Sequence, residues 1–240
     1  DSPAQVIGNP MSNEQSVMRT SLIPGLVDAL IVNVVRQSRS IRLFEYGQCF
    51  TADGDNLTQG FRIGGVLWGL KDPENWSQPA KIADFFDIKG DVERLVATGG
   101  RSATFIVSTR SAFHPGQSAD ICIDDDVVGT LGRLSPELQS KLDIDGDVFL
   151  FECDVEPLLL NRQRRHDEVS RYPSIRRDLA LVVHESVTSE SVEKLIRDAV
   201  GELLVEFRLF DVYKGKGIDS IEKSLAVGLT FQDPAKTLTD

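Results

Sequence analysis

The sequence predicts an α+β protein whose two parts are each built on a largely antiparallel sheet. Short apolar runs of strand type outnumber helical patterns in the first part of the chain. The last part of the chain reads as one strand, one helix and two further strands. Between the two parts lies "NRQRRHDEVSRYPSIRRD", a polar stretch with the composition of a linker.

Composition sets the broad class of protein. With 240 residues, 41% hydrophobic and 26% charged, the chain can form one large globular domain or two ordinary ones. No apolar run is long enough to cross a membrane, so we expect no membrane partner. Three cysteines without a CxxC pair argue against disulfides and zinc and favour a reducing, cytoplasmic location. The start "DSPAQVIGNP" carries no signal peptide and indicates a piece of a longer chain.

The first part opens with a helical pattern. In "SLIPGLVDALIVNVVRQS" apolar residues recur four apart, and Pro24 is tolerated near a first helical turn. Two shorter helical patterns follow, at residues 91–96 and 135–142. Strand-like runs occupy most of the remainder: "IRLFEYGQCF", "FRIGGVLWGL", "KIADFFDI", "TFIVS", "ADICI", "VVGTLG" and "VFLFECDV". This order predicts a mixed or antiparallel sheet with helices packed on it.

Polar residues of the first part do not assemble an active site. His114 precedes a proline and a glycine in "FHPGQ", which is typical of a turn. Three consecutive aspartates, residues 124–126, lie between two strand-like runs and favour a hairpin turn over a metal site. The chain has no phosphate-binding glycine loop and no nucleophile motif. We therefore expect neither a catalytic residue nor a bound metal.

The second part resembles a ferredoxin-like βαββαβ unit. The stretch "DLALVVH" alternates in the manner of a strand, and "SVEKLIRDAV" has helical spacing after a Thr188 or Ser189 cap. Two further strands are predicted at "LVEFRLFDVY" and "KSLAVGLTFQ", the latter with four residues on its core side: Leu225, Val227, Leu229 and Phe231. The closing "PAKTLTD" predicts the start of a helix. Four of the unit's six elements are thus predicted, and the unit is truncated.

The opposite face of that sheet is predicted to be flat. Its outer strands carry small residues at Ala180, Val182, Ala226, Gly228 and Thr230, and the neighbouring strand adds Arg208, Phe210 and Val212. An aromatic ring and an arginine on a flat sheet suit a single-stranded nucleic acid, because bases stack on rings and phosphates attract guanidinium groups. The alternative is a face covered by another domain. The pattern leaves both open.

A cationic loop follows the strand that carries Phe210. In "FDVYKGKGI" two glycines permit positive φ, and Lys214 and Lys216 keep a hairpin loop soluble. Alternatively, the two lysines bring charge to the sheet edge where a polyanion could pass. The whole chain has a net charge of -11, and from residue 168 onward 10 Lys and Arg stand against 13 Asp and Glu. In a chain with this net charge, only a local cationic patch could attract a polyanion, and the patch would act within about a Debye length, near 8 Å.

Eight stretches, in order and spanning nearly the whole chain, resemble the C-terminal half of the bacterial phenylalanyl-tRNA synthetase β subunit. They are "NPMSNEQSVMRTSLIPGL", "RLFEYGQCF", "FFDIKGDVERL", "FHPGQSADI", "GTLGRLSPEL", "RYPSIRRDLALVV", "LFDVYKGKGI" and "KSLAVGLTFQD". The resemblance implies a catalytically silent class II synthetase-like domain over 1–165. It implies a ferredoxin-fold anticodon-binding domain over 168–240 that lacks its last helix and strand.

The resemblance also implies partners and a division of labour. A separate α subunit would perform aminoacylation of tRNA(Phe) with ATP and Mg²⁺, in an α2β2 hetero-oligomer, and this chain would bind no cofactor itself. Class II sites hold ATP with two arginines, and by eye Thr51 and Pro157 occupy those places here. Glu152 and Asp154 stand where glycines would let ATP approach, and a carboxylate repels a triphosphate. The pattern therefore predicts a lost ATP site.

For the second domain the resemblance implies contact with the anticodon stem and loop. Strand geometry and charge make seven residues candidates for tRNA contact: Arg208, Phe210, Lys214 and Lys216, with Arg171, Arg176 and Arg177 reaching phosphates from the strand entrance. Two alternatives remain. A synthetase-like interaction protein would have no tRNA role. A free-standing ATP-dependent ligase with a degenerate site would bind nucleotide, which Thr51 and Pro157 oppose.

Overall fold

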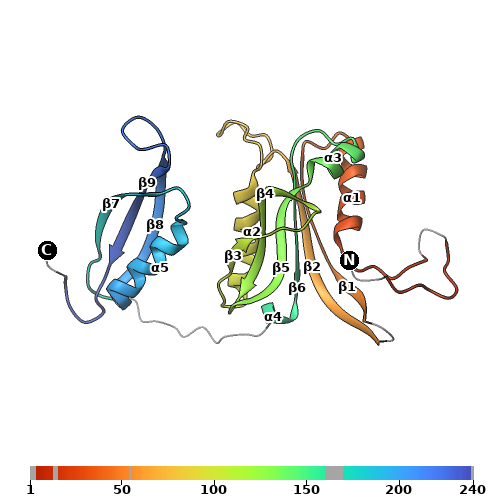
Figure 1. The fold of residues 1–240 in the computed structure, drawn as a ribbon, viewed down its shortest axis with the longest axis horizontal. Helices are drawn as coiled ribbons and strands as arrows, with labels where there is room; N and C mark the ends of the chain where they lie inside the picture. The colour runs from red at the N-terminus through yellow and green to blue at the C-terminus, as the bar shows by residue number, and fades with distance from the viewer. Residues whose placement is uncertain (1–3, 13–15, 54–55, 160–169, 239–240) are drawn as a thin grey trace. The chain divides into compact units, whose positions relative to one another are not determined.

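The chain divides into two compact units, residues 1–164 and 165–240. The computed structural model describes residues 4–12, 16–53, 56–159 and 170–238 (Figure 1). The first unit contains a six-stranded sheet in the order β1-β2-β6-β5-β4-β3, and the second a three-stranded sheet in the order β7-β9-β8. Every neighbouring pair of these strands is antiparallel. The predicted α+β class with antiparallel sheets is confirmed.

The first unit follows the predicted order of elements, except that the strand predicted at "KIADFFDI" is not formed and that a short helix, α4, is added after the last strand. Its elements are α1 (Ile23–Val35), β1 (Ser40–Asp53), β2 (Asn56–Gly69), α2 (Phe85–Thr98), β3 (Thr104–Val107), β4 (Phe113–Ile123), β5 (Asp126–Leu134), α3 (Pro136–Leu142), β6 (Val148–Asp154) and α4 (Glu156–Leu159). Pro24 lies at the start of α1, where a missing backbone N–H costs no helical hydrogen bond.

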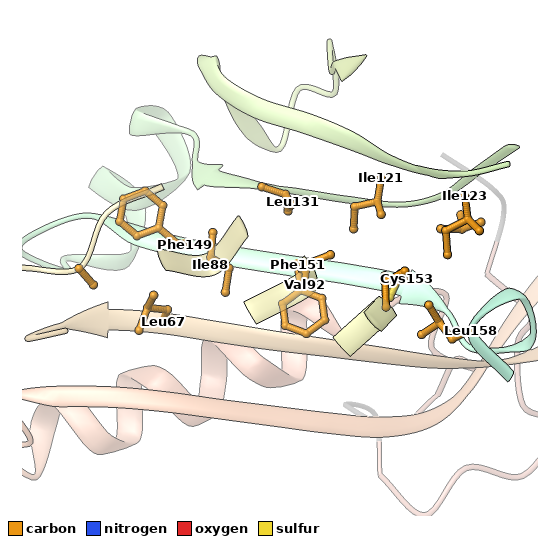
Figure 2. Packing of buried hydrophobic residues seen from close by; sticks show 13 residues of the cluster. Leu67, Ile88, Val92, Ile121, Ile123, Leu131, Phe149, Phe151, Cys153 and Leu158 are labelled. Atoms are coloured by element: carbon orange, nitrogen blue, oxygen red, sulfur yellow. The ribbon is translucent and has the colours of Figure 1, made fainter. Parts of the chain in front are cut away.

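Both faces of the six-stranded sheet are buried, because α1 and α2 lie on opposite faces (Figure 1). Alternate residues of β6 show this. Phe149 and Phe151 pack on the side of α2, whereas Val148 and Leu150 pack on the side of α1. Figure 2 shows the α2 side, where Val92 of that helix lies among the strand side chains. Two-sided burial explains why this strand reads as a continuous apolar run.

The predicted strand "KIADFFDI" is wrong, because its second half forms the first turn of α2. Asp84 precedes the helix, and its carboxylate accepts hydrogen bonds from the backbone N–H groups of Phe86 at 2.8 Å and Asp87 at 3.1 Å. The Asp87 carboxylate accepts in turn from the Asp84 N–H at 3.0 Å. This reciprocal capping box begins the helix within an apolar run that reads as a strand by composition.

The two turn predictions in this unit have different outcomes. Asp124 and Asp125 adopt positive φ, 49° and 70°, and connect β4 to β5 as a tight hairpin, as predicted. The predicted turn at His114 is wrong, because the residue lies within β4. There the pairing with β5 skips from Phe113 to Ser118, so this stretch is an irregular strand. The His114 ring accepts a hydrogen bond from the Gly116 N–H at 3.0 Å.

The second unit has the predicted strand, helix, strand and strand. These are β7 (Ile175–His184), α5 (Ser189–Val200), β8 (Leu204–Tyr213) and β9 (Glu222–Phe231), with one 3-10 turn, η2 (Gly201–Leu203), before β8. Thr188 caps α5 by accepting from the Ser191 N–H at 3.1 Å. The core contains Val227 and Leu229 of β9, with Ile196 of α5 packed against it.

The helix predicted to begin at "PAKTLTD" is not seen where the structure can test it. Thr237 and Leu238 are in irregular structure. Thr239 and Asp240 lie outside the described residues, as does the first half of the predicted linker, and the end of that linker forms the start of β7.

Candidate functional sites

Glu152 and Asp154, which the resemblance placed at a lost ATP site, belong to an ionic network. Arg62 projects from β2 toward the carboxyl end of β6. Its Nη1 donates to Glu152 Oε2 and its Nε to Asp154 Oδ1, each at 3.0 Å. Burial lowers the pKa of Arg62, but the adjacent Glu152 and Asp154 carboxylates outweigh burial and hold that pKa above its usual value. The guanidinium is therefore charged and already paired.

Glu152 connects this network to the start of α1. Its side chain is only 8% exposed. It accepts hydrogen bonds from the Ser21 hydroxyl at 3.1 Å and from the Leu22 backbone N–H. Arg62 Nη1 also donates to the Thr20 carbonyl at 3.0 Å. A buried carboxylate with this many donors is satisfied, so the network fixes the segment before α1 against β2 and β6.

A second arginine of this region is also paired. Arg19 forms an ion pair with Glu45 of β1, and its Nε donates to the Gln48 carbonyl at 2.8 Å. The guanidinium crosses the strand at Gly47, where an added Cβ would lie 2.0 Å from Arg19 Nη2. An added Cβ here would displace the guanidinium from this position.

These residues do not fit a nucleoside triphosphate. Arg19 and Arg62 face three carboxylates, and Arg110, which lines the same pocket as Arg62, is paired with Asp120. Each of these guanidinium groups is therefore already offset by a carboxylate, which disfavours a phosphate group. Thr51 lies farther along β1, opposite Thr58, and Pro157 lies in α4. The sequence pattern indicated Glu152 and Asp154 but neither arginine. Arg62 lies in an apolar strand, and its two partners are 90 and 92 positions away in the chain.

The second unit presents a sheet face opposite α5. The strand register places alternate residues on this face: Arg176, Asp178, Ala180 and Val182 of β7, Ala226, Gly228 and Thr230 of β9, and Glu206 and Arg208 of β8. The predicted face with small central residues is thus present. Its charges are mixed, because three carboxylates accompany the two arginines: Asp178, Glu206 and Asp211.

Arg176 and Phe210 meet on this face. The Arg176 guanidinium carbon lies 5.9 Å from the centre of the Phe210 ring, and Phe210 is 50% exposed. Asp178 accepts a hydrogen bond from Arg176 Nε at 2.9 Å. The guanidinium passes over Gly228, where an added Cβ would lie 2.8 Å from Arg176 Nη2. An accessible ring with a cation beside it is the arrangement that stacks a base and attracts its phosphate.

A β-bulge corrects one placement on this face. Pairing between β8 and β9 shifts between Leu209 and Asp211, so Phe210 is the extra residue. Val212 consequently lies opposite Leu225, on the core side, and its predicted place on the open face is wrong. Asp211 and Tyr213 take the open side instead. The sequence gives no signal for this bulge, and for that reason Tyr213 was missed.

The remaining predicted residues are dispersed. Arg177 pairs with Leu229 and therefore lies on the opposite face from Arg176. Arg171 is exposed in an irregular segment before β7. Lys214 forms an ion pair with Glu185, whose pKa is lowered by the hydrogen bond and charge of that lysine. Lys216 is exposed, and its carbonyl accepts from the Tyr213 hydroxyl at 3.3 Å. The structure thus brings together Arg176, Arg208 and Phe210.

Comparison with known proteins decides the family. Residues 2–155 match the phenylalanyl tRNA synthetase beta chain CLM domain, and residues 170–240 match the ferredoxin-fold anticodon binding domain. The chain belongs to the phenylalanyl-tRNA synthetase β chain family. The resemblance noted in the sequence is therefore confirmed, together with the ferredoxin fold of the second unit.

Curated members of this family align over most of the chain. The phenylalanine-tRNA ligase beta subunit of Pseudomonas fluorescens is 45% identical over 237 residues, covering 98% of this chain and 30% of the relative. That of Pseudomonas putida is 46% identical over 237 residues, with the same shares. The chain thus spans about 30% of the length of these relatives. A solved structure of Desulfitobacterium hafniense PylSc, a pyrrolysyl tRNA synthetase, is 19% identical with a TM-score of 0.47, covering 65% of this chain and 51% of that one.

The described residues contain neither a helix that could span a membrane nor a metal-binding cluster. None of their helices combines the length and apolar character that a membrane crossing requires. No group of three or more acidic, histidine or cysteine side chains among them is arranged to hold a metal ion.

Proposed function

We propose that this chain is a non-catalytic module of a cytoplasmic phenylalanine-tRNA ligase. It supports a separate α subunit, in an α2β2 hetero-oligomer, and helps to position tRNA(Phe) for aminoacylation. ATP and Mg²⁺ are used at the site of the α subunit, and this chain binds neither. The match to an anticodon-binding family carries the proposal, and the accessible Phe210 ring beside Arg176 supplies a surface for a base.

The ionic network supports the non-catalytic part of this proposal. Among the described residues, the arginines of this region, Arg19, Arg62 and Arg110, are all paired with carboxylates, which disfavours a triphosphate. The test is phenylalanine-dependent ATP-pyrophosphate exchange by the complete β subunit alone and after mixing with the α subunit. We expect exchange only in the mixture. Exchange by the β subunit alone would show that this chain has its own nucleotide site and would overturn the proposal.

The tRNA part rests on the open face of the second unit. In the complete complex, Phe210→Ala and Arg176→Ala should each weaken tRNA(Phe) affinity roughly 5- to 150-fold, because a stacked base is worth about 1–3 kcal/mol. Lys194→Ala is the matched control, since it removes an exposed cation from α5 on the other side of the sheet. The measurement is a tRNA-binding titration at two salt concentrations.

The lysine loop is tested in the same titration. Replacing Lys214 and Lys216 together by glutamate should weaken tRNA binding and reduce its salt dependence, since fewer counterions are released. If neither this variant nor Phe210→Ala changes tRNA affinity, the open face does not contact tRNA. The interaction-protein alternative would then be favoured.

A further inference from the structure

The two lysines of the loop between β8 and β9 are in different electrostatic environments. Both side chains are exposed, but Lys214 forms an ion pair with Glu185, the residue directly after β7. The hydrogen bond and charge of Lys214 lower the pKa of Glu185, so this carboxylate is charged at neutral pH. Lys216 has no ion-pair partner among the residues that the structure describes. One of the two cations is therefore already offset, and the other is available.

Glu185 holds both ends of this loop, which covers residues 214–221 between the two strands. Its carboxylate pairs with Lys214, the first residue of the loop. Its backbone N–H donates to the carbonyl of Ile221, the last residue of the loop, at 2.8 Å. Its carbonyl accepts from Lys223 Nζ at 2.8 Å. A single residue outside the loop thus fixes where the loop leaves β8 and where it enters β9.

Lys216 lies at the tip of the loop, in a hydrogen-bonded turn. The Ile218 N–H donates to the Gly215 carbonyl at 3.1 Å, so Lys216 and Gly217 are the central residues of a four-residue turn. Gly217 has a φ of 98°, which glycine adopts without strain. The backbone at Lys216 is therefore ordered before any ligand binds.

Tyr213 joins this tip to the open face of the sheet. Its ring lies on the open side of β8, and its hydroxyl donates to the Lys216 carbonyl at 3.3 Å. The ring also passes close to Gly215, where an added Cβ would lie 2.7 Å from the Tyr213 hydroxyl oxygen. The available lysine is consequently held beside the face that carries Phe210.

We propose that Glu185 is a positioning residue for tRNA: it holds the loop so that Lys216 contacts a backbone phosphate, whereas Lys214 serves the loop and contacts no phosphate. A phosphate beside Lys214 would also meet the Glu185 carboxylate, which repels it. A preorganised loop places its cation at a lower entropy cost than a mobile one. The inference rests on the tRNA role of the proposed function and assigns separate roles to the residues of its lysine loop.

The first test is a tRNA(Phe) titration of the complete complex with Lys216→Ala. This variant should bind several-fold more weakly. Between 50 and 200 mM salt it should lose about threefold less affinity than the wild type, which is the share of one phosphate contact. Lys194→Ala is the matched control, because it removes an exposed cation from α5. A salt dependence equal to that of the wild type would overturn the inference.

The second test exchanges the charges of the ion pair. Lys214→Glu alone should weaken tRNA binding, because it sets two carboxylates against each other at the start of the loop. Adding Glu185→Lys should restore most of the affinity, since the pair forms again with the same net charge. If Lys214 itself contacts a phosphate, the double variant stays as weak as Lys214→Glu, and the inference is overturned. The same exchange in the Glu193–Arg197 pair of α5 is the control and should leave affinity unchanged.

The third test separates positioning from long-range charge. Glu185→Ala removes a negative charge, so a charge effect alone would tighten tRNA binding. Loss of the ion pair should instead weaken binding about two- to tenfold, because the loosened loop must then be ordered on binding. Hydrogen exchange of the amides of residues 214–221, measured without tRNA, should be faster in this variant than in the wild type. Tighter binding or unchanged exchange would contradict a positioning role.

The outcomes distinguish this inference from the proposed function. If Phe210→Ala and Lys216→Ala both leave tRNA affinity unchanged, the open face does not contact tRNA, and the tRNA part of the proposed function fails. If Phe210→Ala weakens binding and Lys216→Ala does not, the roles assigned to Glu185 and Lys216 alone are overturned. Both of these side chains are exposed, so their variants should remain folded.

Discussion

Arg62 Nη1 lies 3.0 Å from Glu152 Oε2, and this contact joins two adjacent strands, β2 and β6. Glu152 is buried, whereas Asp154, the other carboxylate on Arg62, is about half exposed. Arg62 therefore forms one ion pair with a buried carboxylate and one with an exposed carboxylate. Because burial decides the energy of an ion pair, the two carboxylates should contribute differently to stability.

Glu152→Ala should lower the free energy of unfolding by about 3–5 kcal/mol, because it leaves a charged guanidinium and the Leu22 N–H without their buried partner. Glu152→Gln keeps an acceptor and should cost about 1–3 kcal/mol. Asp154→Asn is the control and should cost less than about 1 kcal/mol. Urea unfolding measures all three. Equal losses for Glu152→Ala and Asp154→Asn would contradict the network described here.

A fall in pH should destabilise the first turn of α2. Burial raises the pKa of Asp87, but the hydrogen bond from Lys71 and that from the Asp84 N–H outweigh it, so the pKa lies below its ordinary value of 3.8. Because the pKa of Asp87 is lower in the folded state than in the unfolded state, its carboxylate stabilises the fold at pH values above about 3.8. The contribution is lost as the pH falls below that value, toward the folded pKa.

Asp87→Asn should therefore lower the free energy of unfolding by about 1 kcal/mol at pH 7. The difference in this free energy between the variant and the wild type should shrink as the pH falls from 5 toward 3. Urea unfolding at a series of pH values measures it. Glu93→Gln, an exposed acid later in the helix, is the control. A difference that stays constant over this range would show that the Asp87 charge does not stabilise the helix start.

The Cys153 thiol should resist alkylation in the folded protein. Burial, reinforced by the Asp154 and Glu152 carboxylates, raises its pKa to about 12. At pH 8 its reactive thiolate is then about a thousandfold scarcer than that of an unfolded cysteine. Iodoacetamide labelling followed by mass spectrometry, with and without urea, tests this. Equal labelling rates in the two states would contradict the buried position on β6.

Much of the fold is predictable because local signals agreed with the final packing. The apolar stripe of α1, the Thr188 cap and the alternation of β9 each act within one element, so each is visible in the sequence. Two errors share a different cause. The Asp84 capping box overrides an apolar run, and the bulge at Phe210 changes which face Val212 occupies. Both depend on a few hydrogen bonds that composition does not reveal.

The candidate sites were less predictable than the fold. Charge and aromatic character pointed to Arg208 and Phe210, but strand register decides which neighbours share their face. Register places Arg176 beside Phe210 and sends Arg177 to the other side. The register of a strand cannot be predicted from a single sequence when both faces of the strand carry a mixture of polar and apolar residues.

Gly228 offers the last test, because it links the strand backbone to the placement of Arg176. An added Cβ would lie 2.8 Å from Arg176 Nη2, the far end of a flexible side chain, so Gly228→Ala should displace the guanidinium rather than the strand. Stability should change by less than about 1 kcal/mol, since alanine is tolerated in strands. Affinity for tRNA(Phe) should fall several-fold, because the cation leaves the Phe210 ring.

Gly60→Ala is the matched control for this substitution. Gly60 lies in β2, and nothing stands within 4 Å of an added Cβ there. Urea unfolding and the tRNA titration are run on both variants. A loss of affinity in Gly228→Ala with unchanged stability would locate the contact at Arg176 and Phe210. Unchanged affinity would mean that the position of this guanidinium does not matter to tRNA, and the Arg176 assignment would have to be abandoned.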